Sequence, residues 1–415
     1  MEKLLIKNIS QLVTPKGKTA RHGIAMRQIE IQENAAIYIE AGIIQKVGNS
    51  ADVEIYAKKA GDDFKIVNAH GKCAIPGFID PHTHFLFGGS RADEFIDRLA
   101  GVPYLELLKQ GGGICSTMQS TRESSEESLY QSGRAVLNNM LKLGVTSLEG
   151  KSGYGLDKDT ELKQLRVMHR LKQDLPISLK TTFLGAHAVP PEYKGNGDQY
   201  IDFLVNDVLK QVKKENLADF CDVFCETGVF SLEQSERLLS TAAQMGFKLK
   251  MHADEINSLG GAALAHKLKA ISADHLLAIT EADIQVLSSG NTIAVLLPAT
   301  AFCMRKPFAP ARKMIDTGCA VALASDFNPG SCYTYSIPLI LALAVISMQM
   351  TLEEALTAIT LNAAAATDQA DSVGSIEQGK RADILLLAYP DYRFLVYHTG
   401  INIVQHVIKD GELLW

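Results

Sequence analysis

Two features are missing from this sequence of 415 residues: an apolar run long enough to cross a bilayer, and an excess of positive charge. The most apolar stretch, residues 337–350, is too short for a membrane span and contains Pro338 and Gln349, so we expect it to form a buried helix. The 41 Lys and Arg residues are outnumbered by 47 Asp and Glu residues, which gives a net charge of −6. This balance argues against nucleic acid and anionic membranes as partners.

Cysteine is also sparse. The seven cysteines, an odd number, are scattered along the chain, which argues against a disulfide framework and for a reducing compartment. Residues 1–14 carry charges within their apolar stretch and no cleavage site, so we expect no signal peptide and predict a cytoplasmic protein. The composition, 47% hydrophobic and 21% charged, is that of an ordinary globular protein, and the length suits a large barrel with an appended domain.

Both ends of the chain show β patterns. Residues 36–40 and 43–47 form a predicted hairpin, and a second hairpin is centred on Asp410 and the glycine after it. The FLVY segment, residues 394–397, is also rich in β-forming residues. We therefore predict a small composite β-sandwich domain formed from both termini, with residues 1–70 and 371–415 as its two parts.

The middle of the chain alternates strand and helix patterns. Because eight β/α repeats are typical of a (β/α)8 barrel of the TIM type, we predict that fold for residues 71–370. In such a barrel the functional side chains lie where strands end and loops begin. The candidate strands are 74–84, 145–154, 177–187, 221–229, 247–255, 270–275, 292–300 and 321–329.

Two histidines with one residue between them, His82 and His84, end the first candidate strand. Residues i and i+2 of a strand point to the same face, so both imidazoles can reach one metal ion. Each histidine alone would more simply be a surface or core residue, but other metal-competent side chains also fall at predicted strand ends. These are His187, Glu226, His252, His275 and Asp326.

Three imidazoles and one carboxylate make a site suited to a single Zn²⁺ or Fe ion. We assign His82, His84, His252 and Asp326 as its ligands, with a water in the remaining position whose pKa the metal would lower. A lysine that is carboxylated can bridge two metals in some hydrolases, and Lys151 follows the second strand, but it lies outside this set. We therefore favour one metal and interpret Lys151 as a charge-pairing residue, with two metals as the alternative.

Side chains next to the ligands are candidates for proton transfer. Glu255 follows His252 by three residues and could pass a proton from water to a leaving nitrogen. The simpler interpretation of Glu255 is a loop carboxylate or a helix cap partner. His275 is placed to stabilise an attacking hydroxide or a developing oxyanion, and Asp326 could share the proton handling.

An anionic substrate needs a cation in the site. Arg91, in the loop after the first strand, could bind a carboxylate through two hydrogen bonds. The alternative is a solvated loop arginine. Tyr104, Tyr154 and His187 offer further hydrogen-bond donors from neighbouring loops.

The segments PGFIDPHTH, HADE, SADH, ASDFNPG and GKRADILLL resemble the amidohydrolase superfamily of metal-dependent hydrolases, and the similarity covers essentially the whole chain. The longer motifs FLFGGSRADEF, EGKSGYGL and TTFLGAHAVP resemble members that open the ring of a cyclic amide bearing a carboxylate tail. The resemblance implies a hydrolase of carbon–nitrogen bonds that holds one Zn or Fe and forms a homodimer. It also implies the four metal ligands assigned above, and contacts to the substrate from Arg91, Tyr104, Tyr154, His187, Glu255, Asn328, Gly330 and Ser331.

Two other interpretations stay open. A related amidohydrolase that deaminates a heterocycle would share the metal ligands but would have no use for Arg91 with a neutral base. A barrel that serves only as a binding or scaffold module would be expected to have lost ligands, whereas all four are present in this sequence.

Overall fold

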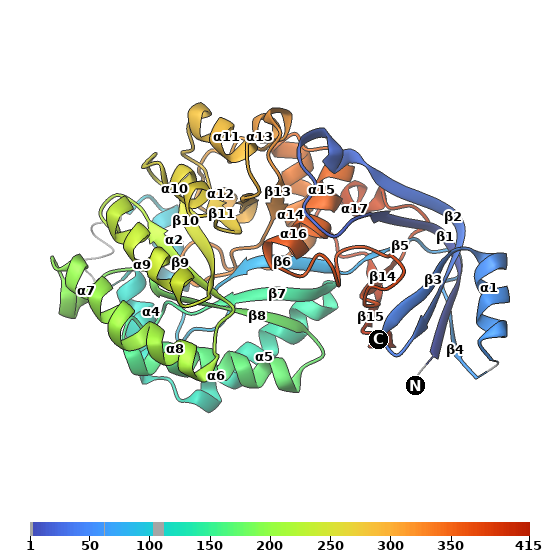
Figure 1. Cartoon of the computed structure of the whole chain (residues 1–415), viewed down its shortest axis with the longest axis horizontal. Coiled ribbons are helices and arrows are strands. Elements are labelled where there is room, and N and C mark those ends of the chain that lie inside the picture. Colours follow the sequence, from blue (N-terminus) through green and yellow to red (C-terminus); the bar gives the residue numbers. More distant parts are fainter. Residues whose placement is uncertain (1–2, 62, 103–111) are drawn as a thin grey trace.

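The computed structural model describes residues 3–61, 63–102 and 112–415, and in them a barrel lies beside a separate β-sheet (Figure 1). Tyr104, one of the predicted substrate contacts, lies outside these residues. The two ends of the chain both belong to the separate sheet.

Eight parallel strands form the barrel, and each is hydrogen-bonded to the next in chain order. The ring approaches closure where Thr83, in the first strand, forms a parallel bridge with Phe327, just after the last. The strands are β6 (Phe78–Thr83), β7 (Val145–Lys151), β8 (Ser178–Ala186), β9 (Phe220–Cys225), β10 (Lys248–Ala253), β11 (Ser272–His275), β12 (Ile293–Leu296) and β13 (Val321–Leu323). The predicted (β/α)8 barrel is confirmed.

Helices cover the outer face of the barrel (Figure 1). The barrel strands are almost wholly buried, because side chains also fill the interior of such a barrel. The helices of the described part are α1 (Ser50–Lys59), α2 (Ala92–Leu99), α4 (Ile114–Glu123), α5 (Glu126–Lys142), α6 (Lys158–Asp174), α7 (Gly197–Phe203), α8 (Leu209–Glu215), α9 (Leu232–Gln244), α10 (Gly261–Lys267), α11 (Glu281–Ser288), α12 (Pro298–Cys303), α13 (Ala311–Thr317), α14 (Ile337–Ala342), α15 (Leu352–Ile359), α16 (Leu361–Ala366) and α17 (Phe394–Tyr397). Shorter 3-10 turns are η1 (Gly23–Arg27) and η2 (Pro191–Tyr193), and π-helical turns are η3 (Leu204–Val208) and η4 (Leu343–Ser347).

The second sheet is mixed and joins strands from both termini. Its strands are β1 (Lys3–Pro15), β2 (Ile29–Glu40), β3 (Ile43–Asn49), β4 (Lys65–Asn68), β5 (Ala74–Pro76), β14 (Ile384–Leu387), β15 (Val404–Lys409) and β16 (Glu412–Leu413). Strand β14 pairs with β5, and β5 leads directly into barrel strand β6. The sheet is therefore joined to the barrel at the strand that carries His82. The predicted β domain formed from both termini is confirmed, and its limits near residues 70 and 370 stay a prediction.

One local prediction is wrong. The FLVY segment forms the short helix α17 rather than a strand. Asp391 accepts a hydrogen bond from the backbone N–H of Arg393 at 2.8 Å, which turns the chain before the segment. The Phe394 ring then stacks on Tyr389 at a centroid distance of 4.3 Å, and Leu395 is buried. Packing of these rings outweighs the β preference of the four residues.

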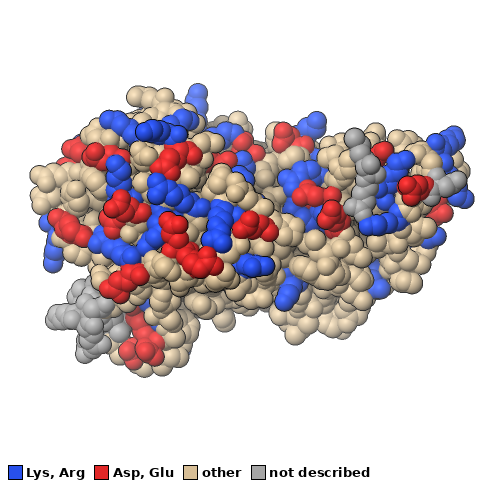
Figure 2. Space-filling view, turned by 90° about the horizontal axis from the view of Figure 1, so that it is seen from below, with Lys and Arg blue, Asp and Glu red and all other residues tan. Residues whose placement is uncertain are grey.

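The apolar stretch at residues 337–350 contains helix α14 and turn η4, and most of its side chains are buried, as predicted. Among the described residues, no helix is both long and apolar enough to pass through a membrane. Figure 2 shows basic and acidic side chains interspersed over the face that it presents.

Candidate metal centre and substrate cavity

A cavity of about 760 Å³ opens at the carboxyl ends of the barrel strands. His82 lies at its floor, fully buried. The structure brings the other predicted site residues within the described part to the cavity wall: His84, Arg91, Tyr154, His187, His252, Glu255, His275, Asp326, Asn328, Gly330 and Ser331. For the histidines and Asp326, strand-end position in the sequence was therefore a sound guide to which side chains meet.

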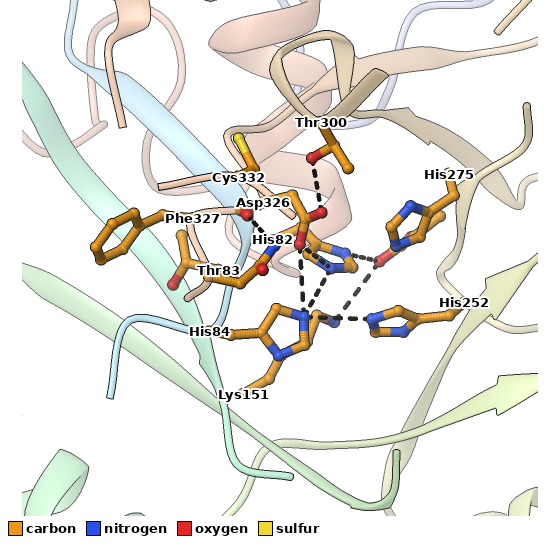
Figure 3. Close-up of polar contacts among 12 residues, drawn as sticks. His82, Thr83, His84, Lys151, His252, His275, Thr300, Asp326, Phe327 and Cys332 are labelled. Carbon is orange, nitrogen blue, oxygen red and sulfur yellow. Dashed lines mark hydrogen bonds and ion pairs between the residues drawn. The ribbon is translucent and has the colours of Figure 1, made fainter. Parts of the chain in front are cut away.

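The four predicted metal ligands converge at this floor (Figure 3). Nε2 of His84 lies 3.2 Å from Nε2 of His82 and 3.3 Å from Nε2 of His252. Oδ1 of Asp326 lies 3.4 Å from Nε2 of His82 and 3.6 Å from Nε2 of His84. All four side chains are buried, with at most 2% of each residue exposed.

These separations fit one metal ion. Bonds of about 2.0–2.1 Å in a tetrahedral site place neighbouring donor atoms roughly 3.3–3.4 Å apart, close to the spacing observed. Burial lowers the pKa of both His82 and His84 well below its ordinary value, so their imidazoles are neutral, the form that binds metal. The donor set of three nitrogens and one oxygen suits zinc or iron.

Each of three proposed ligands has a buried partner behind it. Nδ1 of His82 lies 2.6 Å from Oδ2 of Asp274, and Nδ1 of His252 lies 3.0 Å from Oδ2 of Asp222. The Thr300 hydroxyl donates a hydrogen bond of 2.7 Å to Oδ2 of Asp326.

The sequence interpretation missed these three partners. A usable signal existed for Asp222 and Asp274, because each is a carboxylate among mostly apolar or small residues of a short candidate strand, and a buried charge requires a partner. Thr300 ends the seventh candidate strand, where the sequence predicted no metal ligand, and it lies in helix α12 in the structure.

Two site residues adopt backbone conformations that are uncommon outside glycine. His275 has φ 79° and Asp326 has φ 52°, and strained residues of this kind cluster at functional sites. Among the described residues neither ring nitrogen of His275 has a hydrogen-bond partner, although Nδ1 lies 3.5 Å from Oε2 of Glu255. Its ring nitrogens thus remain available to a ligand in the cavity.

The two carboxylates of the HADE segment, Asp254 and Glu255, have different roles. Asp254 accepts four backbone N–H groups at the start of helix α10, which is a capping role. Glu255 faces the cavity instead, where burial, and then the nearby Asp326 charge, raise its pKa to about 8. Glu226, also at a strand end, accepts the backbone N–H groups of the two residues that follow Glu255 and so holds that loop.

Arg91 also lines the cavity. Its guanidinium donates two hydrogen bonds to the carboxylate of Glu94, one of them at 2.9 Å, and Glu94 also accepts the backbone N–H of Gly113 at 2.8 Å. The remaining nitrogen, Nη1, lies against Gly330, where an added Cβ would collide with it. Arg91 is therefore held in place with one nitrogen directed toward the Gly330 loop.

The loop after strand β13 is organised by Asn328. Its Oδ1 accepts the backbone N–H groups of Gly330 at 2.8 Å and Ser331 at 2.7 Å, while its Nδ2 donates to the backbone oxygen of Asp326. On the other side of the cavity, the His187 ring stacks on His84 at 4.9 Å, and burial lowers the pKa of His187 to about 3.

A family model described as "Amidohydrolase family" matches residues 73–414. With the barrel and its histidine and aspartate cluster, this match shows that the chain belongs to the amidohydrolase family, as the sequence motifs predicted. The chain is therefore an enzyme of a hydrolytic family.

Curated relatives with high sequence identity point to one group within this family. The chain is 52% identical over 412 residues to the imidazolonepropionase of Clostridium tetani, covering 99% of this chain and 98% of that protein. It is 53% identical over 413 residues to the imidazolonepropionase of Parabacteroides distasonis, with the same coverage. An adenosine deaminase from Xanthomonas campestris, solved with bound zinc, has a similar fold, with a TM-score of 0.70 at 17% identity over 99% of this chain and 92% of that one.

Proposed function

We propose that this enzyme catalyses the imidazolonepropionase reaction, in which water opens the ring of 4-imidazolone-5-propanoate to give N-formimino-L-glutamate. The observation that carries the proposal is that one cavity is lined both by side chains able to bind a metal ion and by Arg91, which can bind a carboxylate. The relatives that are 52–53% identical over nearly the whole chain bear this name and support the choice. A heterocycle deaminase is not favoured, because the likeness to the deaminase shows the fold alone.

His82, His84, His252 and Asp326 would hold one metal ion, Zn or Fe, at the cavity floor. When bound, the metal would supply Lewis-acid polarisation and a water nucleophile at neutral pH. Lys151 lies among carboxylates rather than at this floor, which supports one metal rather than two.

The chain's own side chains would then position the substrate and move its proton. Arg91 binds the propanoate tail, while Tyr154 and His187 orient the ring. Water adds to the ring carbonyl, and His275 donates a hydrogen bond to the oxygen that becomes negative.

As the carbon–nitrogen bond breaks, Glu255 transfers the proton taken from water to the leaving ring nitrogen. Asp326 would share this proton handling, since it also lines the cavity and burial raises its pKa to about 6. Asn328, Gly330 and Ser331 complete the wall beside the tail.

Three further properties belong to the same proposal. We expect a cytoplasmic enzyme, because all seven cysteines are unpaired in the structure. We expect a homodimer, as the family resemblance implies. We expect no nucleic acid partner, given the net charge of −6.

The decisive experiment is hydrolysis of freshly generated 4-imidazolone-5-propanoate, followed by loss of its ultraviolet absorbance, with metal and ammonia measured on the same sample. Metal-dependent turnover to N-formimino-L-glutamate without ammonia is the expected result. Ammonia release would instead support a deaminase. No turnover by a metal-loaded sample would refute the proposed reaction and direct the search to other cyclic amides and amidines.

A further inference from the structure

The barrel interior below the metal floor contains a buried lysine among carboxylates. Nζ of Lys151, at the end of β7, lies 2.7 Å from Oδ2 of Asp222 on β9 and 2.8 Å from Oε1 of Glu149 on its own strand. It also lies 3.6 Å from Oδ2 of Asp274 on β11. All four side chains are fully buried, so these contacts are shielded from water. The sequence interpretation of Lys151 as a charge-pairing residue agrees with this position.

The two aspartates that contact Lys151 are the same two that contact proposed metal ligands. Oδ2 of Asp274 lies 2.6 Å from Nδ1 of His82, and Oδ2 of Asp222 lies 3.0 Å from Nδ1 of His252. In both cases one carboxylate oxygen contacts the lysine and the histidine together. A continuous path of contacts thus runs from His82 through Asp274, Lys151 and Asp222 to His252 (part of it drawn in Figure 3).

We propose that Lys151 is a positioning residue that fixes His82 and His252 together, through Asp274 and Asp222, in the orientation needed to bind the metal. A carboxylate that accepts the Nδ1–H of a histidine leaves the Nε2 lone pair free for a metal. One ammonium that holds both carboxylates sets two ligands at once. This inference rests on the metal site of the proposed function.

The charge of Lys151 is secured by the same neighbours. Burial alone would lower the pKa of Lys151, but Asp222, Glu149 and Asp274 outweigh it and raise the pKa well above its ordinary value. Without the ammonium, Asp222 and Asp274 would lose the cation that they share, while Glu149 would keep its contact with Lys250. We therefore expect these two aspartates to move apart, and the orientations of His82 and His252 to loosen with them.

The test is zinc affinity, measured by competition with a chromophoric chelator on protein stripped of metal, for wild type, Lys151→Met and Asp274→Asn. Partners behind metal ligands are typically responsible for about 10- to 100-fold in affinity, so we expect losses of that size in each variant. Because both changes break the same path, their combination should lose less than the product of the two single effects. In zinc-saturated variants kcat should fall while KM, which we expect Arg91 to set, changes little.

A matched control exists in the terminal sheet. Lys409 is 1% exposed on its side chain and is held by Asp383 at 3.0 and 3.1 Å and by Asp410 at 2.8 Å. Lys409→Met removes a buried ammonium from two carboxylates, where Lys151→Met removes one from three. In the Lys409 cluster neither carboxylate contacts a proposed metal ligand. Thermal unfolding should show a loss of stability in both variants, with zinc affinity unchanged only in Lys409→Met.

The outcomes separate this inference from the proposed function. A folded Lys151→Met protein with wild-type zinc affinity overturns the inference, while turnover by wild type still supports the function. If Lys151→Met does not fold, Asp274→Asn, which keeps the side-chain shape, decides in its place: wild-type affinity overturns the inference and a loss supports it. A wild-type protein that binds no zinc and hydrolyses no substrate refutes the proposed function as well.

Discussion

Replacement of Arg91 by methionine tests how the enzyme recognises the tail of its substrate. Arg91 lines the cavity, and its fork to Glu94 holds the guanidinium in place before any substrate arrives. A hydrogen bond between charged groups contributes about 1.5–3 kcal/mol, and 1.4 kcal/mol corresponds to a factor of ten. We therefore expect KM for the anionic substrate to rise about 10- to 150-fold in Arg91→Met, with a much smaller change in kcat.

A rise in KM in Arg91→Met could also come from the Glu94 carboxylate, which would lose its partner. A double variant separates the two explanations. Burial by itself would raise the pKa of Glu94, but the hydrogen bonds from Arg91 and the Gly113 N–H hold it below its ordinary value, so the carboxylate is ionised. Loss of Arg91 leaves that negative charge in the wall, where it would repel an anionic substrate. The double variant Arg91→Met/Glu94→Gln removes the repulsion and keeps the loss of the guanidinium.

Steady-state kinetics on the anionic substrate and on its neutral tail amide decide between the two explanations. If Arg91 binds the tail, KM stays high in the double variant and the tail amide is affected little by either change. An unchanged KM in Arg91→Met would refute the tail-binding role. A KM restored in the double variant would refute it too, and would leave Arg91 as a charge partner of Glu94.

Three further predictions concern the metal, the proton and the fold. His252→Ala should lose bound metal and activity together, and activity retained by a metal-free variant would contradict the ligand assignment. Glu255→Gln should keep its metal while kcat falls about 10²- to 10⁴-fold, the usual contribution of a general acid–base group; near-normal kcat would exclude it from proton transfer. Glu354, whose side chain is fully buried, accepts hydrogen bonds from Arg27 and Arg312, and together with the Thr351 N–H these outweigh burial and lower its pKa. Because the folded pKa lies below the ordinary value of 4.5, the ionised group stabilises the fold above that pH and the stabilisation is lost as pH falls through the folded pKa. Glu354→Gln should therefore cost about 1.5–3 kcal/mol of unfolding free energy at pH 7, and the difference from wild type should shrink in acid; a pH-independent difference would contradict this assignment.

The sequence predicted the barrel and the metal-competent side chains at its strand ends because strand periodicity and strand-end chemistry are local properties, whereas Gly330 and Ser331 were expected only from the family resemblance. His82 and His84 are two residues apart on one strand, so their shared direction follows from backbone geometry alone. The link from Asp222 to His252 could not be derived in this way, since it depends on the register between β9 and β10 and on which face each strand presents. The ion pair between Arg91 and Glu94 could not be derived from the sequence either. The two side chains meet because helix α2 begins directly after Arg91, and the sequence alone did not fix where that helix begins.

The same periodicity explains why the site has two layers. On β10, Lys250 and His252 point to one face, and on β7 Glu149 and Lys151 do the same. Lys250 and Lys151 both contact Glu149, so the lower layer consists of paired charges that no solvent reaches. Such a layer is a costly way to stabilise a barrel, because well-packed apolar residues of similar volume are often as stable or more so. The position of this charged layer directly beneath the proposed metal ligands is better explained by a role in orienting those ligands than by a contribution to the stability of the fold. Lys151→Met should therefore cost metal affinity even if its loss of stability is no greater than that of Lys409→Met.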